Sequence, residues 1–235
     1  MDPNILYEDA SIIVVVKPAQ VPSQKDLSGD LDMTALLMAY FIKKYPKLEK
    51  PYVGLIHRLD RPVSGVMVFA KRALTNARLS EQIREGHMSK EYLAVVCGTP
   101  KEGKGELVDY LTKSSNNLSK VVKEVTADAK KAVLHYEHIK TILDDRYGDI
   151  SLLRVQLLTG RHHQIRVQLS HAGLPIWGDT RYNLSFNTDA EVGQKKSWYQ
   201  IALCANKLSF EHPKTNKLMT FEWEPKDYPF DQFTH

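Results

Sequence analysis

The stretch His57-Arg58-Leu59-Asp60-Arg61-Pro62-Val63-Ser64-Gly65 separates two apolar segments and is the most informative part of the chain. It places one carboxylate, Asp60, between two arginines, with a histidine before them and a proline and a glycine after them. A guanidinium group within about 4–6 Å holds an aspartate ionised and lowers its pKa by roughly 1–3 units. A catalytic carboxylate that works as an anion needs such surroundings. An ordinary ion pair in a loop between two strands would show the same residues, so both interpretations stay open at this point.

Length and composition predict a folded chain with a mild basic excess. Its 235 residues suit one domain, or at most two small ones, and 43% hydrophobic residues are enough for a core. The formal net charge is +4 and the sequence pI is about 8.9, which is compatible with a polyanionic partner. Cys97 and Cys204 both lie in apolar runs, as is typical of a reduced compartment. We expect a cytoplasmic protein without membrane spans, because no signal-peptide layout and no run of ~20 apolar residues is present.

Hydrophobic periodicity predicts an α+β domain with mainly antiparallel strands. Helical spacing of apolar residues favours helices over 32–44, 74–86 and from 164 towards 173. The polar stretch 103–131 is interpreted as a hairpin or a mobile excursion. Predicted strands cover residues 5–9, 11–18, 52–56, 66–70, 90–98, 130–141, 151–158, 201–205, 208–210 and 219–223.

A second basic run, Thr159-Gly160-Arg161-His162-His163-Gln164-Ile165-Arg166, opens the third predicted helix. The chain has no phosphate loop, dinucleotide fingerprint, zinc spacing or serine-hydrolase elbow. Helix N-termini favour anions, so Arg161 is a candidate partner for Asp60, and Gln164 and Arg166 are candidate contacts to a backbone. An ordinary surface cation is the alternative for Arg161.

Three long motifs resemble the signature regions of RluA-type pseudouridine synthases. They are HRLDRPVSGVMVFAK (57–71), SKEYLAVVCG (89–98) and TGRHHQIRVQLSHAGLPIWGD (159–179), in order and with sensible spacings. The resemblance implies a single catalytic domain over residues 1–235, an α+β fold with a mainly antiparallel mixed sheet, flanking helices and a central active-site cleft. Many relatives carry a small RNA-binding module ahead of this domain. We expect none here, because the first catalytic-type strand begins within the first residues.

The resemblance also implies an activity, the isomerisation of uridine in rRNA or tRNA to pseudouridine without a metal, organic or nucleotide cofactor. It makes Asp60 the essential carboxylate, which either attacks the anomeric carbon or removes a proton from the ribose 2′ carbon. Tyr92 is implied as the base for the carbon-5 proton, and a nearby cation would help it in that role. Arg161 is implied as the partner that keeps Asp60 ionised and oriented.

RNA-binding residues are expected on the same motifs. Arg58 matches the residue that fills the space of the flipped nucleotide, with His57 and Leu59 beside it. The second group of RNA-binding candidates is Gln164, Ile165 and Arg166, and Leu59 and Ile165 are expected to line the pocket. Arg61 has no assigned role. A sequence-independent grip on the RNA backbone is expected from Lys17, Lys71, Arg72, Arg78, Arg84, Lys90 and Arg166.

Two other classes of function remain open. A catalytically silent RNA-binding protein or RNA chaperone would bind RNA and form no pseudouridine. A glycosidase acting on a nucleoside would release free base. The resemblance favours the isomerase, and we expect a monomer.

Overall fold

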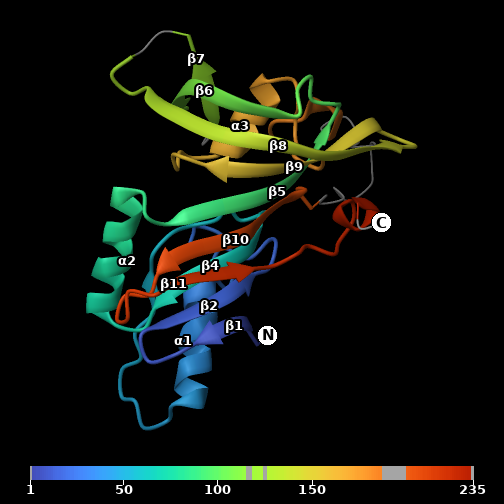
Figure 1. Cartoon of the computed structure of the whole chain (residues 1–235). Helices are drawn as coiled ribbons and strands as arrows, with labels where there is room; N and C mark the ends of the chain where they lie inside the picture. Colours follow the sequence, from blue (N-terminus) through green and yellow to red (C-terminus); the bar gives the residue numbers. More distant parts are fainter. Residues whose placement is uncertain (1, 115–117, 124–125, 187–199, 234–235) are drawn as a thin grey trace. The chain divides into compact units, whose positions relative to one another are not determined.

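The structure is a computed structural model that describes residues 2–114, 118–123, 126–186 and 200–233. The chain forms two compact units, each with helices beside β-strands (Figure 1). Unit 1 comprises Met1–Lys90 and Ala205–Glu224, and unit 2 comprises Glu91–Cys204 and Pro225–His235. This architecture confirms the predicted α+β class. Within the described ranges, no helix is long and apolar enough to cross a membrane.

Unit 1 is built on a sheet whose central strands are rich in β-branched residues. All residues of β2 are buried, as are nearly all of β4, so these two antiparallel strands form the centre of its core. Phe210 of β10 packs in the same cluster. The sheet order is β1 (Asn4–Glu8), β2 (Ile12–Lys17), β4 (Ser64–Ala70) and β10 (Leu203–Glu211), with β3 (Gly54–Leu55) on β4 and β11 (Leu218–Glu222) on β10.

Two helices of unit 1 follow the local signals in the sequence. Helix α1 (Met33–Lys44) begins at Asp32, whose carboxylate accepts the backbone N–H groups of Thr34 and Ala35. Helix α2 (Ala73–Glu85) ends at Gly86, which adopts the left-handed conformation that favours glycine. Both predicted helices are therefore confirmed.

Unit 2 contains an antiparallel sheet with one helix, α3 (Gln164–His171), packed against its strands β6 and β7. Strands β6 and β7 form the hairpin that was one of two interpretations of 103–131, although residues 115–117 and 124–125 of that stretch lie outside the described residues. Short 3-10 helices cover Leu184–Phe186 and Phe230–Phe233. The sheet order is β5 (Ser89–Cys97), β9 (Gly148–Leu157), β8 (Lys130–Asp144), β6 (Lys104–Lys113) and β7 (Ser119–Val122).

Strand ends differ most from the predictions. The strand expected over 52–56 is reduced to the two residues of β3, which pair with the end of β4 at Phe69 and Ala70. Strand β8 continues beyond its predicted end to Asp144, because it stays paired with β9 up to the turn before Gly148. Tertiary pairing sets these boundaries, and the local pattern does not contain it.

Candidate active site

Asp60 lies in unit 1 on a turn between β3 and β4, which we call the Asp60 turn (residues 57–63). Exposure alternates along it: Arg58 is exposed, Leu59 is buried and Asp60 is half-buried. The Asp60 carbonyl accepts the Val63 N–H at 3.0 Å, which closes the turn. The serine hydroxyl of Ser23 holds the backbone of Leu59 by two hydrogen bonds. The backbone that carries Asp60 is thus well fixed.

Arg58 points its charge to solvent, as an RNA-contacting residue should. The structure gives it no hydrogen bond or ion pair to another described residue of unit 1. An exposed guanidinium of this kind is available to a base or a phosphate.

His57 is buried, in contrast to its expected contact with RNA. Its Nε2 accepts the Val68 N–H at 3.4 Å, and among the described residues its Nδ1 has no hydrogen-bond partner. Burial, and to a lesser degree the charge of Lys90, lower the pKa of His57 to about 3. The ring is therefore neutral at physiological pH, and it holds the start of the Asp60 turn against β4.

Arg61, which had no role on sequence grounds, pairs with the loop that precedes α1. Its guanidinium forms an ion pair with Asp30 and another with Asp26 at 3.7 Å. The Arg61 hydrogen bond is the main cause that lowers the pKa of Asp30, whereas the Ser28 hydroxyl is the main cause for Asp26. Arg61 therefore fastens a loop to the Asp60 turn.

Tyr92 and Arg161 belong to unit 2 and lie towards one end of its sheet. Tyr92 of β5 is buried and faces Val155 of β9, two residues before β9 ends. The segment between β9 and α3, residues 158–163, follows that end directly, and we call it the Arg161 turn. Arg161 is exposed; its Nε donates to the Lys131 carbonyl at 2.9 Å and its N–H donates to Gln164 Oε1 at 2.9 Å. Within unit 2, its two terminal nitrogens have no partner among the described residues.

Three predicted RNA contacts on the Arg161 run are corrected by their burial. Gln164 hydrogen-bonds Thr159 Oγ1 and the Val133 carbonyl, and Ile165 is a core residue. Arg166 is 4% exposed and makes a two-point ion pair with Asp179, at 2.7 and 2.8 Å. These buried side chains hold the Arg161 turn in place.

Of the cations expected to grip the RNA backbone, Lys17 is buried, and Lys71 and Lys90 are partly buried. Lys17 is fully buried, and Lys71 binds Glu8 at 2.7 Å beneath the rings of Phe41 and Tyr45. Burial lowers the pKa of Lys90. A cluster of exposed lysines lies elsewhere, on and beside the β6–β7 hairpin. No described residue forms an ion pair with any of its members, which are Lys113, Lys120, Lys123, Lys130 and Lys131.

A hydrogen-bonded network joins this hairpin to the Arg161 turn. The Ser119 hydroxyl donates to the His162 carbonyl at 2.6 Å and lies 2.9 Å from His162 Nδ1. The backbone N–H of Ser119 donates to Tyr182 Oη at 2.8 Å. The same phenol contacts His163 Nδ1 at 2.8 Å, and the two histidine rings stack 3.8 Å apart. The lysine-rich hairpin and Arg161 are thereby held as one piece of structure.

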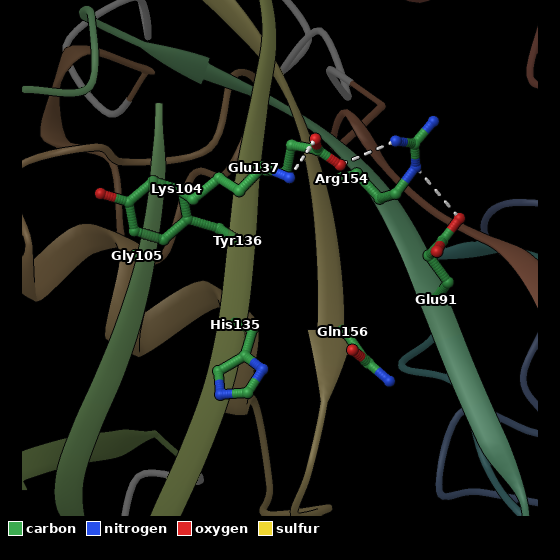
Figure 2. A pocket seen from close by; sticks show the side chains of 8 residues that line it. All are labelled: Glu91, Lys104, Gly105, His135, Tyr136, Glu137, Arg154 and Gln156. Atoms are coloured by element: carbon green, nitrogen blue, oxygen red, sulfur yellow. Dashed lines mark hydrogen bonds and ion pairs between the residues drawn. The ribbon is translucent and has the colours of Figure 1, made fainter. Parts of the chain in front are cut away.

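Unit 2 also has a pocket of about 400 Å³ on its sheet (Figure 2). Its charges neutralise one another: Arg154 pairs with Glu91 at 3.3 Å and Glu137 at 3.0 Å, and Lys104 pairs with Glu137 at 2.9 Å. None of its lining residues belongs to the signature motifs except Glu91. We do not consider it the active site.

The family model described as RNA pseudouridylate synthase matches residues 11–171. This range contains Asp60, Tyr92 and Arg161. The chain belongs to this family. Its members are isomerases that convert uridine in RNA to pseudouridine, which confirms the activity and the RNA substrate implied by the motifs.

Relatives of the chain carry the same activity in their names. This chain is 32% identical over 223 residues to the ribosomal large subunit pseudouridine synthase D of Vibrio cholerae. The alignment covers 93% of this chain and 66% of the relative. It is 33% identical over 237 residues to the enzyme of the same name in Pasteurella multocida, covering 96% and 68%. An uncharacterized RNA pseudouridine synthase of Bacillus subtilis, YlyB, is 31% identical over 225 residues, covering 94% and 69%.

Solved structures support the fold. Human RNA pseudouridylate synthase domain containing 1 matches with a TM-score of 0.75 at 20% identity, covering 97% of this chain and 85% of that one. Human RNA pseudouridylate synthase domain containing 4 matches with a TM-score of 0.75 at 22% identity, covering 98% and 92%. At these identities the likeness shows a pseudouridine synthase fold.

Two contacts with the Asp60 turn, from Lys17 and Ser23, escaped prediction. The sequence places Lys17 at the end of a β-branched strand, where a lysine is usually solvated, and Ser23 in an unremarkable loop. No local pattern marks either as a partner of residues about forty positions away.

Proposed function

We propose that this enzyme modifies ribosomal RNA and that Asp60 is its essential carboxylate. The observation that carries the proposal is the family match from residue 11 to residue 171, which includes all three catalytic candidates in their motifs. The relatives from Vibrio cholerae and Pasteurella multocida are named for the large ribosomal subunit, which favours rRNA over tRNA as the substrate. The match also crosses from unit 1 into unit 2, which supports one catalytic domain made of both units.

In this proposal Asp60 acts as an anion. It either attacks the anomeric carbon of the target uridine or removes the ribose 2′ proton, and in both cases the glycosidic bond breaks and the base reattaches through carbon 5. Arg161 is exposed at the turn before α3, which supports its proposed role as the cation that stabilises the Asp60 carboxylate. Tyr92 is proposed to take the carbon-5 proton at the end of the reaction.

RNA recognition is proposed to rest on Arg58 and on the lysines of the β6–β7 hairpin. A flipped uridine leaves a gap in the stack, and a planar guanidinium such as that of Arg58 can fill it. The hairpin lysines would hold the phosphate backbone. A monomer in the cytoplasm stays our prediction, and light scattering of the purified protein tests the oligomeric state.

The decisive experiment is Asp60→Asn, assayed by tritium release from rRNA labelled at carbon 5 of uracil. Without the carboxylate, turnover should fall by at least about 10⁴-fold, while RNA binding persists. Asp145→Asn, at an exposed aspartate of the β8–β9 turn, is the matched control and should keep full activity. Undiminished turnover in Asp60→Asn would overturn the assignment of Asp60.

The products separate the remaining classes of function. Chromatography of digested RNA should show pseudouridine and no released uracil, whereas a nucleoside glycosidase would release the base. Binding without any product would indicate a silent RNA-binding protein. Pseudouridine mapping in cells with and without the gene identifies the RNA, and a lost site in tRNA alone would contradict the rRNA proposal.

A further inference from the structure

One short segment of unit 1, Lys17–Ser23, contacts the backbone on both sides of Asp60. Its members come from the end of β2 and the loop that follows, about forty residues before the Asp60 turn. We propose that Ser23 and Lys17 are positioning residues that set the direction of the Asp60 carboxylate. This inference rests on the proposed role of Asp60.

Ser23 holds the residue before Asp60. Its hydroxyl donates to the Leu59 carbonyl at 2.8 Å and accepts the Leu59 N–H at 3.1 Å. A hydroxyl offers one donor and two acceptor positions, so a single oxygen satisfies both backbone groups of Leu59. Ser23 is 5% exposed and Leu59 is 6% exposed, so water cannot readily take over these bonds. The Leu59 peptide groups are therefore fixed in orientation.

Lys17 holds the residue after Asp60. Its ammonium group is fully buried and donates to the carbonyls of Val21 at 2.7 Å, Pro18 at 3.0 Å and Arg61 at 3.1 Å. The Gln20 N–H donates to the same Arg61 carbonyl at 2.8 Å. A buried charge requires hydrogen-bond partners. Because the ammonium group of Lys17 binds carbonyls of both segments, it joins the loop after β2 to the Asp60 turn.

The two contacts leave Asp60 little backbone freedom. Leu59 is held through both of its backbone groups, Arg61 through its carbonyl, and the Asp60 carbonyl itself closes the turn to Val63. The direction of the Cα–Cβ bond of Asp60 follows from these peptide planes. Catalytic groups need placement within about 0.5 Å, and an error of about 1 Å can reduce the rate about 100-fold.

The ion pairs of Arg61 add exposed contacts between the Asp60 turn and the loop that follows β2. Asp26 and Asp30 lie in the loop that continues from Ser23, and both face the Arg61 guanidinium. These pairs are exposed, so we assign the positioning to the buried contacts of Ser23 and Lys17 and treat Arg61 as an auxiliary contact.

Ser23→Ala tests the inference, because it removes both bonds to Leu59 and adds no bulk. We expect kcat to fall about 10–100-fold with KM and RNA affinity unchanged, since no RNA-binding group is altered. Ser151→Ala is the matched control: Ser151, on β9 of unit 2, is also buried and donates to a backbone carbonyl, that of Gly98 at 2.7 Å. It should melt earlier, as Ser23→Ala should, but keep its kcat.

A second variant keeps the test meaningful if Ser23→Ala folds poorly. Ser23→Cys has nearly the same volume and only a weak donor, and its kcat should lie between those of the alanine variant and the wild type. Wild-type kcat in a folded Ser23→Ala or Ser23→Cys protein would overturn the inference while Asp60→Asn remained inactive. If Asp60→Asn were itself active, the proposed function would fail instead.

Discussion

Asp60 illustrates how a single side chain is prepared for catalysis by its neighbours. Arg58 before it faces solvent, Leu59 is buried, and the carboxylate lies half-buried between a core-anchored backbone and the outside. Ser23 contacts the backbone of Leu59 and Lys17 contacts the carbonyl of Arg61, so these buried contacts orient the turn through its backbone.

Gly65, just after the Asp60 turn, has a backbone that excludes any side chain. Its φ is +131°, and a Cβ there would lie 2.3 Å from the carbonyl oxygen of Ala205. We therefore expect Gly65→Ala to destabilise the fold by about 3 kcal/mol or more, because backbone strain of about 1–3 kcal/mol adds to a backbone clash. Urea unfolding measures the loss.

Gly86→Ala is the matched control for this prediction. Gly86 also has a positive φ, +75°, but a Cβ there meets no atom within 4 Å. It should lose only about 1 kcal/mol, the cost of placing an L-residue in the left-handed region. Equal losses in the two variants would show that the contact with Ala205 is unimportant.

At the scale of elements, Glu8 fastens helix α1 to the sheet of unit 1. Its carboxylate accepts bonds from Tyr40 Oη at 2.9 Å and from Lys44, Tyr45 Oη and Lys71 at 2.7 Å each. Burial raises its pKa, but the hydrogen bonds outweigh burial, with Lys44 and Lys71 first, and lower the pKa of Glu8 to about 2.

Glu8→Gln should therefore reduce stability in a pH-dependent way. The contribution of a carboxylate with a depressed pKa is complete above its unfolded value near 4.5 and disappears as the pH falls towards 2. We expect a loss of about 1.5–3 kcal/mol at pH 7 that shrinks between pH 5 and pH 2, measured by urea unfolding. Glu222→Gln, which breaks an exposed pair with Lys207, should change stability by less than about 1 kcal/mol. A deficit independent of pH would contradict the role given to the ionised carboxylate.

For the whole molecule, the position of the charges matters more than their sum. The excess is only four positive charges, with 32 Lys and Arg against 28 Asp and Glu. Arg166 and Lys17 are buried, and Lys71 is partly buried in an ion pair with Glu8. Unit 2 instead concentrates exposed lysines near the Arg161 turn, and Ser119 joins the two. The local field there should govern RNA binding.

The salt dependence of RNA affinity tests this view. Replacing Lys120 and Lys123 with glutamine should weaken binding and reduce the slope of log Kd against log salt by about 0.7–0.9 for each lost phosphate contact. Lys104→Gln is the control, because Lys104 lies on the same hairpin but is paired with Glu137. An unchanged slope in the double variant would place the RNA on another surface.

Local sequence patterns are enough to predict the helices, the fold class and the family. Periodicity predicts the three helices, Asp32 and Gly86 mark helix ends, and three ordered motifs indicate a pseudouridine synthase. Such features are local, so short stretches of sequence contain them completely. Asp60, Tyr92 and Arg161 came from the same motifs, and their catalytic roles stay predictions.

The tertiary structure alone decided which polar residues are internal. Arg58 and Arg166 are equally basic and equally close to a signature motif, yet one faces solvent and the other is sealed against Asp179. Lys17 and Ser23 each have a partner on the Asp60 turn, 44 and 36 positions away along the chain. The residue type gives the charge of a side chain, but its burial depends on which other parts of the chain pack against it.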